Sequence, residues 1–150
     1  MAKLSAGLLL FRRTANGLEV FLVHPGGPFF AKKDLGCWSI PKGEYTEDED
    51  PLAAALREFQ EETGFTVAGE FIPLKELRQP GGKIVKTWAV EGDLNASGLR
   101  SNMFSMEWPP KSGKIREFPE VDRGEWFSIE VARTKLLPGQ AGFLDQLLAL

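Results

Sequence analysis

The pattern of apolar and polar positions predicts two strands at the start of the chain. The runs from Leu4 to Arg12 and from Leu18 to His24 are rich in Leu, Val and Phe. They are joined by Thr14-Ala15-Asn16-Gly17, whose Asn-Gly pair supplies the positive φ angles of a tight hairpin. The stretch from Pro25 to Trp38 is broken by Gly and Pro, so we expect a long loop that could face a substrate.

The middle of the chain predicts three more strands and a second loop region. Residues 65–77 and 83–91 have the character of strands, and Gln79-Pro80-Gly81-Gly82 is the turn between them. Residues 125–127 (Glu-Trp-Phe) predict a further short strand. Residues 95–114 contain Trp108-Pro109-Pro110, and we expect them to form a loop.

The clearest helix begins at Pro51 and ends before Gly64. Asp50 is suited to cap it, Pro51 fits the first helical position, and Gly64 can adopt the left-handed conformation that ends it. Apolar residues recur at helical spacing on one face of this segment. They are Leu52, Ala55, Leu56 and Phe59.

Two shorter helices are expected near the C-terminus. Ser128 is placed to cap a helix that extends to about Leu137. A terminal helical stripe follows, formed by Phe143, Leu144, Leu147 and Leu148. Together with the strands, these helices predict a mixed sheet with helices packed on it, in the α+β or α/β class.

Length and composition predict one domain over residues 1–150, with 43% hydrophobic and 26% charged residues. The only cysteine, Cys37, excludes an intramolecular disulfide and a zinc site built on several cysteines. The apolar run at 5–11 is too short to cross a membrane and is followed by two arginines, so we expect a cytoplasmic protein without membrane contact. The net charge of −3 argues against a duplex nucleic acid as partner.

Three carboxylates gather toward the end of the helix from Pro51. Glu58, Glu61 and Glu62 are three or four positions apart or adjacent, so they share one patch of the helix surface. Their mutual repulsion and the negative end of the helix dipole are opposed locally only by Arg57. Spacing alone fits a solvated acidic helix end and a site for a divalent cation equally well. Carboxylate ligands suit Mg²⁺, and the scarcity of His and Cys argues against zinc.

A longer motif surrounds these glutamates. Gly43 is followed after five residues by Glu49 and after seven more by Arg57-Glu58-Phe59-Gln60-Glu61-Glu62-Thr63-Gly64-Phe65. This segment resembles the Nudix box, the loop–helix–loop signature of the Nudix hydrolases, with every charged and glycine position filled. Phe59 stands where the family usually has an aliphatic residue, which concerns packing. The resemblance implies the family's α/β/α sandwich, with a mixed β-sheet between helices, for the whole chain.

The same resemblance implies metal-dependent cleavage of a pyrophosphate bond in a nucleoside diphosphate derivative. It implies Glu58 and Glu62 as the main ligands of Mg²⁺, with Mn²⁺ as an alternative, and Glu61 as the ligand of a further metal or a bridging water. Arg57 would orient the glutamates with Glu49 as its partner, and the main-chain carbonyl near Lys42 could complete a metal shell. Gly43 and Gly64 would let the backbone turn tightly on either side of the helix.

The base that activates water is open at this stage. It could be a glutamate of the box or a downstream carboxylate, for which Glu107, Glu117 and Glu120 are the candidates. Taken alone, each of these three is more typical of a surface charge. A structural or solvent role is also favoured over acid–base work for His24, the only histidine.

Several residues outside the box are candidates for substrate binding. Lys42 and Lys32, with the adjacent Lys33, could hold phosphate oxygens, although a solvated loop explains the last two equally well. Trp88 and Trp126 are expected in the core. Four aromatic residues lie in predicted loops where a nucleobase could stack. They are Phe29, Phe30, Phe104 and Trp108.

The chain gives mixed signals on the substrate. Pro41-Lys42-Gly43 resembles the diadenosine-polyphosphate hydrolases more than the MutT-like members, but the tyrosine that those hydrolases often carry after the box is missing. Pro80 resembles a marker of ADP-ribose pyrophosphatases, and a hairpin turn explains it as well. We therefore expect a small nucleotide, preferably a nucleoside or dinucleoside polyphosphate. The alternatives are an ADP-ribose or nucleotide-sugar pyrophosphatase, a non-catalytic nucleotide-binding module, and a structural protein.

Overall fold

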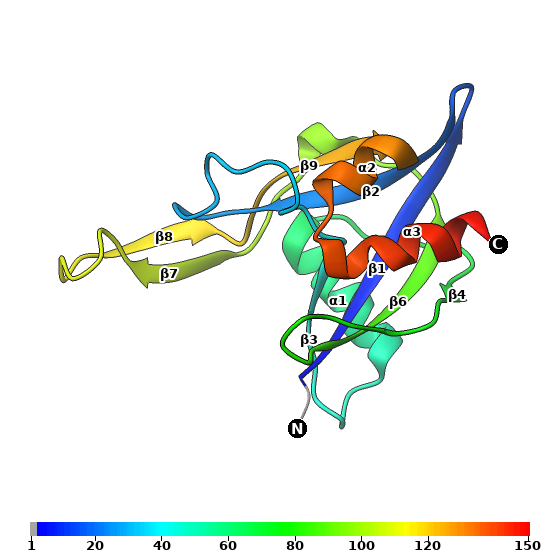
Figure 1. Cartoon of the computed structure of the whole chain (residues 1–150). Coiled ribbons are helices and arrows are strands. Elements are labelled where there is room, and N and C mark those ends of the chain that lie inside the picture. Colours follow the sequence, from blue (N-terminus) through cyan, green and yellow to red (C-terminus); the bar gives the residue numbers. More distant parts are fainter. Residues whose placement is uncertain (1–2) are drawn as a thin grey trace.

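A computed structural model describes residues 3–150 and shows a mixed sheet at the centre of the molecule (Figure 1). Strand β1 runs parallel to β6 and antiparallel to β2, and β2 pairs antiparallel with β9. The short β3 pairs with β1, while β4 and β5 pair with β6. The seven strands of this sheet are β1 (Leu4–Thr14), β2 (Gly17–Pro25), β3 (Lys42–Glu44), β4 (Ile72–Pro73), β5 (Leu77–Arg78), β6 (Ile84–Glu91) and β9 (Val121–Ser128).

Helices cover both faces of the sheet and bury two separate apolar clusters. Helix α1 (Pro51–Thr63) packs on the face that carries Leu8 and Phe21. Helices α2 (Ile129–Lys135) and α3 (Ala141–Leu148) pack on the opposite face, and short 3₁₀ turns occur at Ala96–Gly98 and Pro138–Gln140. Alternating side chains of β1 and β2 point into one cluster or the other, as the period of a strand requires. The predicted α+β sandwich is thus confirmed.

The predicted strands at 4–12, 18–24 and 83–91 and the helix at 51–63 are confirmed, with small changes at their ends. In the first hairpin only Gly17 has a positive φ, of 113°, so Asn16 does not contribute the second one. The predicted strand at 125–127 is the end of the longer β9, and the helix capped by Ser128 stops at Lys135. Leu148 is 51% exposed and lies outside the buried stripe of α3.

The predicted strand at 65–77 is wrong for most of its length. Only Ile72–Pro73 and Leu77–Arg78 pair with β6 in this part of the chain. Phe65, Val67 and Phe71 give the segment its apolar character, and they pack against the cluster under α1 as side chains of an irregular stretch. The apolar composition of this segment therefore reflects the burial of its side chains and not strand pairing.

The predicted loop at 95–114 is also wrong in part. Strand β7 (Met103–Glu107) lies within it and pairs antiparallel with β8 (Ile115–Pro119) as a separate two-stranded sheet. Pro109 and Pro110 occupy the turn between the strands, so they do not interrupt the pairing. We call residues 103–119 the arm, because the hairpin projects from the body of the molecule (Figure 1). No helix within residues 3–150 has the length and apolarity needed to cross a bilayer.

Candidate active site

The candidate site is organised around the C-terminal half of α1. Asp50 accepts a hydrogen bond from the amide of Ala53 at 3.0 Å and caps the helix, as its sequence position predicts. Gly64 ends the helix with φ 79° and donates its amide to the carbonyl of Gln60 at 2.8 Å. Phe59 is fully buried against the sheet, so the helix cannot rotate and its polar face is held in place.

Arg57 links three acidic side chains. Its Nη2 lies 3.0 Å from Glu49 Oε2, and its Nη1 lies 2.9 Å from Glu58 Oε1 and 3.6 Å from Glu61 Oε1. Because guanidinium geometry fixes the directions of these contacts, Arg57 holds Glu58 in one orientation. Glu49 precedes the helix, so the same side chain also ties the incoming loop to α1.

Gly43 is required by the close approach of Glu58, and this differs from the expected role in a turn. Gly43 lies in the extended strand β3, and a Cβ atom there would sit 2.0 Å from the carboxyl carbon of Glu58. Any other residue would displace that carboxyl group. Of the two glycines at the ends of the box, Gly64 has a left-handed backbone and Gly43 does not.

Glu62 points back toward β3 and is the most deeply placed of the box glutamates. Its Oε1 accepts a hydrogen bond from the backbone amide of Lys42 at 3.1 Å. Burial, with the Glu58 and Glu120 carboxylates, raises the pKa of Glu62 to about 8, although the Lys42 amide acts against the shift. Burial, followed by the neighbouring Lys83, lowers the pKa of the Lys42 ammonium. An anion bound between these groups would raise the pKa of both, because negative charge favours the protonated form of each.

Of the three downstream carboxylates, the structure brings only Glu120 to the box. Asn102 joins the two segments, since its amide donates to the carbonyl of Glu61 and its carbonyl accepts from the amide of Glu120, both at 2.8 Å. Burial, followed by repulsion from Glu61, raises the pKa of Glu120. Glu107 instead accepts the amides of Lys111 and Gly113 in the turn of the arm, and Glu117 pairs with Ser105 within it.

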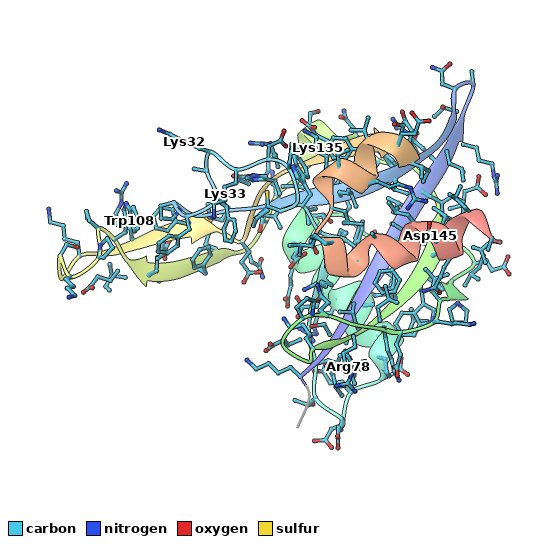
Figure 2. The ribbon with its side chains drawn as sticks, viewed as in Figure 1. Lys32, Lys33, Arg78, Trp108, Lys135 and Asp145 are labelled. Atoms are coloured by element: carbon cyan, nitrogen blue, oxygen red, sulfur yellow. The ribbon has the colours of Figure 1, made fainter. Side chains whose placement is uncertain are left out.

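A cavity of about 250 Å³ opens beside these carboxylates. Its charged lining residues are Glu62, Glu120 and Lys42, and Phe30 also lines it. Lys32 lies on the same loop as Phe30 but is exposed and does not line the cavity, and Figure 2 shows its side chain at the outer edge of the molecule. Of the substrate-binding candidates, Lys42 and Phe30 line the cavity and Lys32 does not. The remaining lining residues are Val23, Pro25, Cys37, Ser39, Val121 and Leu137.

His24 fixes the loop that carries Phe30. The imidazole is fully buried, with Nδ1 2.8 Å from Asp122 Oδ1 and Nε2 2.6 Å from the carbonyl oxygen of Lys33. It therefore joins the loop to β9, and the expected structural role is the one the geometry supports. Lining residues such as Leu137 come from the far end of the chain, and no signal in the sequence connects them to the box.

The donor set fits a divalent cation. Burial and neighbouring carboxylates raise the pKa values of Glu58, Glu62 and Glu120, although Arg57 acts against the shift at Glu58 and Lys42 acts against it at Glu62. A bound cation would favour the ionised carboxylates. No three Asp, Glu, His or Cys side chains within residues 3–150 converge as a complete metal cage. Mg²⁺ needs no such cage, because it binds through one or two carboxylates and takes water and phosphate oxygens as its other ligands.

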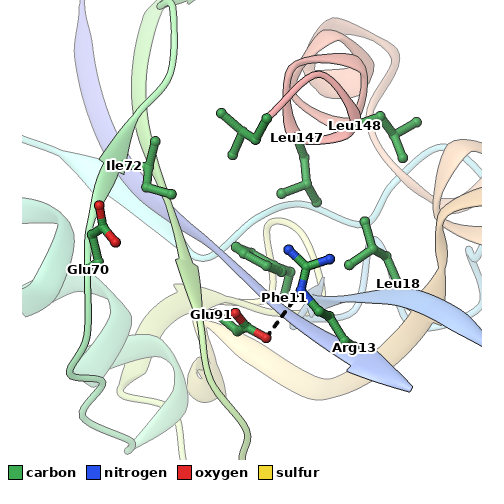
Figure 3. Close-up of a pocket in the computed structure, with 9 residues that line it drawn as sticks. Phe11, Arg13, Leu18, Glu70, Ile72, Glu91, Leu147 and Leu148 are labelled. Atoms are coloured by element: carbon green, nitrogen blue, oxygen red, sulfur yellow. Dashed lines mark ion pairs between the residues drawn. The ribbon is translucent and has the colours of Figure 1, made fainter. Parts of the chain in front are cut away.

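A second, larger hollow of about 540 Å³ lies near the turn between β1 and β2 (Figure 3). Its charged residues are Arg13, Glu70 and Glu91, and the Arg13 Nε is paired with Glu91 at 3.5 Å. Apolar side chains of α3, including Leu147 and Leu148, form much of its wall. None of the box residues reaches this hollow, whereas Glu62 of the box lines the smaller cavity.

Comparison with known proteins agrees with the geometry. Residues 1–147 match the NUDIX domain, and the chain therefore belongs to this family. This result confirms the resemblance seen in the box and the expected class of enzyme, a hydrolase of pyrophosphate bonds.

Similar sequences include an RNA pyrophosphohydrolase of Rhodospirillum rubrum, which is 25% identical over 97% of this chain and 90% of its own length. The mRNA-decapping protein g5R of African swine fever virus is 62% identical over 29 residues, or 19% of this chain. The chain spans only 12% of the length of that viral protein.

Solved structures show the same fold. An Ap4A hydrolase of C. elegans superimposes with a TM-score of 0.65 at 22% identity, covering 97% of this chain and 96% of its own. The NUDIX domain of NrtR from Shewanella oneidensis, complexed with ADP ribose, gives a TM-score of 0.68 at 18% identity, with coverages of 99% and 88%.

Proposed function

We propose that the chain is a metal-dependent hydrolase that cleaves the pyrophosphate linkage of a nucleoside or dinucleoside polyphosphate. The observation that carries this proposal is the cavity lined by Glu62, Glu120, Lys42 and Phe30. A cavity with carboxylates for a metal, a cation for phosphate and an aromatic ring for a base fits such a substrate. Similarity to an Ap4A hydrolase and an RNA pyrophosphohydrolase supports the substrate class.

In this proposal Glu58 and Glu62 would hold Mg²⁺ or Mn²⁺, and Glu61 would bind a further metal or a bridging water. The bound metal would neutralise charge on the phosphates. Arg57, anchored by Glu49, keeps Glu58 in its orientation. The ammonium group of Lys42 attracts phosphate oxygens from the wall of the cavity.

We further assign Glu120 as the base. A water oxygen attacks one phosphorus atom, the bridging P–O bond breaks, and the water proton passes to the Glu120 carboxylate. The pKa of Glu120 is raised by burial and by Glu61, which brings its proton affinity closer to that needed at neutral pH. Glu120 is held to Gly26 and Asn102 by its own backbone, so its carboxylate needs little rearrangement to act.

The test is hydrolysis of a panel of dinucleoside polyphosphates, nucleoside triphosphates, ADP-ribose and nucleotide sugars, with Mg²⁺ present and then chelated. Wild-type protein should release product only with metal. Glu62→Gln should lower kcat at least about a hundredfold. Glu117→Gln on the arm removes the same charge away from the cavity and should leave kcat unchanged.

Other outcomes identify the alternatives. Metal-independent binding of a nucleotide without turnover would identify a binding module, and preferential turnover of ADP-ribose or a nucleotide sugar would replace the substrate. A structural protein would show no turnover, and Glu62→Gln would change only stability.

The proposal also includes a cytoplasmic location. The sole cysteine, Cys37, is buried and free, which supports a reducing compartment.

A further inference from the structure

The arm and the neighbouring loop form a continuous surface that begins at the cavity. We call residues 26–36 the aromatic loop. Phe29 of this loop contacts Trp108 of the arm edge-on, with ring centroids 5.3 Å apart. Phe30, the next residue, lines the cavity beside Glu62 and Glu120. Figures 1 and 2 show the loop and the arm extending together away from the sheet.

The charge of this surface is opposite to that of the rest of the chain. Its 28 residues contain five basic and three acidic side chains, a net charge of +2. The other 122 residues contain 13 basic and 18 acidic side chains, a net charge of −5. The chain as a whole is therefore acidic, but the arm and the aromatic loop beside the cavity are basic.

The basic side chains of this surface are available to a ligand. None of the five forms an ion pair with any residue in the described range 3–150. Two of the three acidic groups are already engaged, Asp34 by Lys135 and Glu107 by two backbone amides of the arm. The five exposed basic residues are Lys32, Lys33, Lys111, Lys114 and Arg116.

Aromatic rings lie among these cations. Phe29 is 58% exposed, and the Lys33 ammonium lies 5.4 Å from the centroid of Phe30. On the arm, the guanidinium of Arg116 lies 5.8 Å from the centroid of Phe118. Exposed and half-buried rings among cations that form no ion pair are the features with which proteins bind single-stranded nucleic acid, by stacking on bases and attracting the backbone.

The arm is longer than a mononucleotide, so a single nucleotide cannot contact its whole length. Five extended residues span about 17 Å at about 3.4 Å per residue. Stacked nucleotides of one strand rise about 3.4 Å each, so the arm matches about five of them. A substrate with its polyphosphate at the glutamates reaches Lys114 only if a chain of nucleotides follows.

We propose that the arm and the aromatic loop bind the first nucleotides of a single-stranded oligonucleotide whose 5′-polyphosphate is cleaved at the box. This inference rests on the proposed function for the reaction itself. Stacking and phosphate contacts need no particular base sequence, so we expect recognition of a single strand with little sequence preference.

The test compares an eight-nucleotide single strand carrying a 5′-triphosphate, made as RNA and as DNA, with the free nucleoside triphosphate. The arm variant Lys114→Glu/Arg116→Glu is matched by Lys75→Glu/Arg78→Glu, which reverses the same two charge types away from the arm. For wild-type protein the KM of the strand should be at least about tenfold below that of the mononucleotide. The arm variant should remove this difference, and the matched variant should retain it.

Binding is measured separately from turnover, by fluorescence anisotropy of the 3′-labelled strand in EDTA. Loss of two phosphate contacts should reduce the slope of log K against log salt by about 1.4 in the arm variant. The milder Lys114→Gln/Arg116→Gln should lie between wild type and the charge reversal. Thermal melting of each variant verifies that the body of the protein is folded.

The inference is overturned if the strand has no advantage over the mononucleotide, or if both double variants weaken it equally. It is also overturned if the arm variant changes the oligomeric state in gel filtration and the KM follows that change, because the arm would then be an interface between copies. Tighter binding of the RNA or of the DNA strand supports the inference and identifies the preferred sugar. Metal-dependent cleavage of small nucleotides without any advantage for the strand would refute the inference alone. Strand binding that the arm variant weakens, without any turnover, would refute the proposed function and the cleavage of the strand, and would leave only the binding surface.

Discussion

Helix α1 and the arm both border the candidate site, but different forces hold them. Helix α1 is capped at both ends and buries Phe59 in the core, and Arg57 fixes its acidic face. The arm is a two-stranded hairpin that projects from the body, and its apolar residues Met103 and Ile115 are 52% and 68% exposed. Groups held by dense packing keep one geometry, whereas an exposed hairpin can adapt to a flexible ligand.

The largest effect is expected where the helix meets the core. Phe59→Ala removes a fully buried ring that packs 6.3 Å from the ring of Phe21. We expect a loss of about 3–5 kcal/mol in the free energy of unfolding, because a cavity replaces the ring. Urea denaturation of wild type and variant measures this difference in the free energy of unfolding. A loss below about 1 kcal/mol would show that α1 is not anchored by this contact.

Gly43→Ala tests whether the tight contact under the helix orients the carboxylate. The added methyl group would overlap the carboxyl carbon of Glu58, so Glu58 must move. We expect kcat to fall about a hundredfold, the scale of effect that a misplacement of about 1 Å can have. Gly98→Ala is the control, because its methyl group would meet only the Phe65 ring at 3.3 Å. Equal activities of both variants would contradict the role of Gly43.

The same two regions differ in how far the sequence predicted them. Asp50, Pro51 and Gly64 are local signals, and they predicted α1 correctly because capping and backbone preferences act within a few residues. The strand prediction for residues 65–77 fails because the apolar side chains of this segment are buried without strand pairing. The predicted loop at 95–114 is wrong for this hairpin because Pro109 and Pro110 are typical of loops, and the strand pairing joins residues that are 8 to 16 positions apart.

The candidate site also has a part that the sequence predicted and a part that only the structure shows. The spacing of the box placed Arg57 and the glutamates on one helix, and the structure adds the close approach of Gly43 to Glu58. Sequence could not choose among Glu107, Glu117 and Glu120. That choice depends on Asn102, which bonds to both Glu61 and Glu120 and has no local signature.

The raised pKa of Glu62 predicts a pH dependence for the metal-free protein. Its value of about 8 lies above the ordinary value of 4.5, so folding favours the protonated carboxyl. The stability that this group contributes is complete below about pH 4.5 and is lost as the pH rises toward 8, by at most about 1.4 kcal/mol per pH unit.

Chemical denaturation in EDTA between pH 5 and 8 measures this slope. Glu62→Gln cannot ionise and should flatten it, so the variant should be more stable than wild type at pH 8. Saturating Mg²⁺ should restore the wild-type protein at high pH, since a metal binds the ionised carboxylate. Identical slopes for wild type and variant in EDTA would show that Glu62 is not the titrating group.

The smallest effect on global stability is expected in the arm. Phe118 packs on Phe104 with ring centroids 6.0 Å apart, and both lie outside the two main apolar clusters. Phe118→Ala should therefore loosen the hairpin while changing the free energy of global unfolding by less than about 1 kcal/mol. Hydrogen exchange of amides in β7 and β8 should accelerate, and exchange in α1 should not. If the exchange of α1 accelerated equally, the arm and the body would unfold as one cooperative unit, and the arm could not rearrange around a ligand while the glutamates keep their positions.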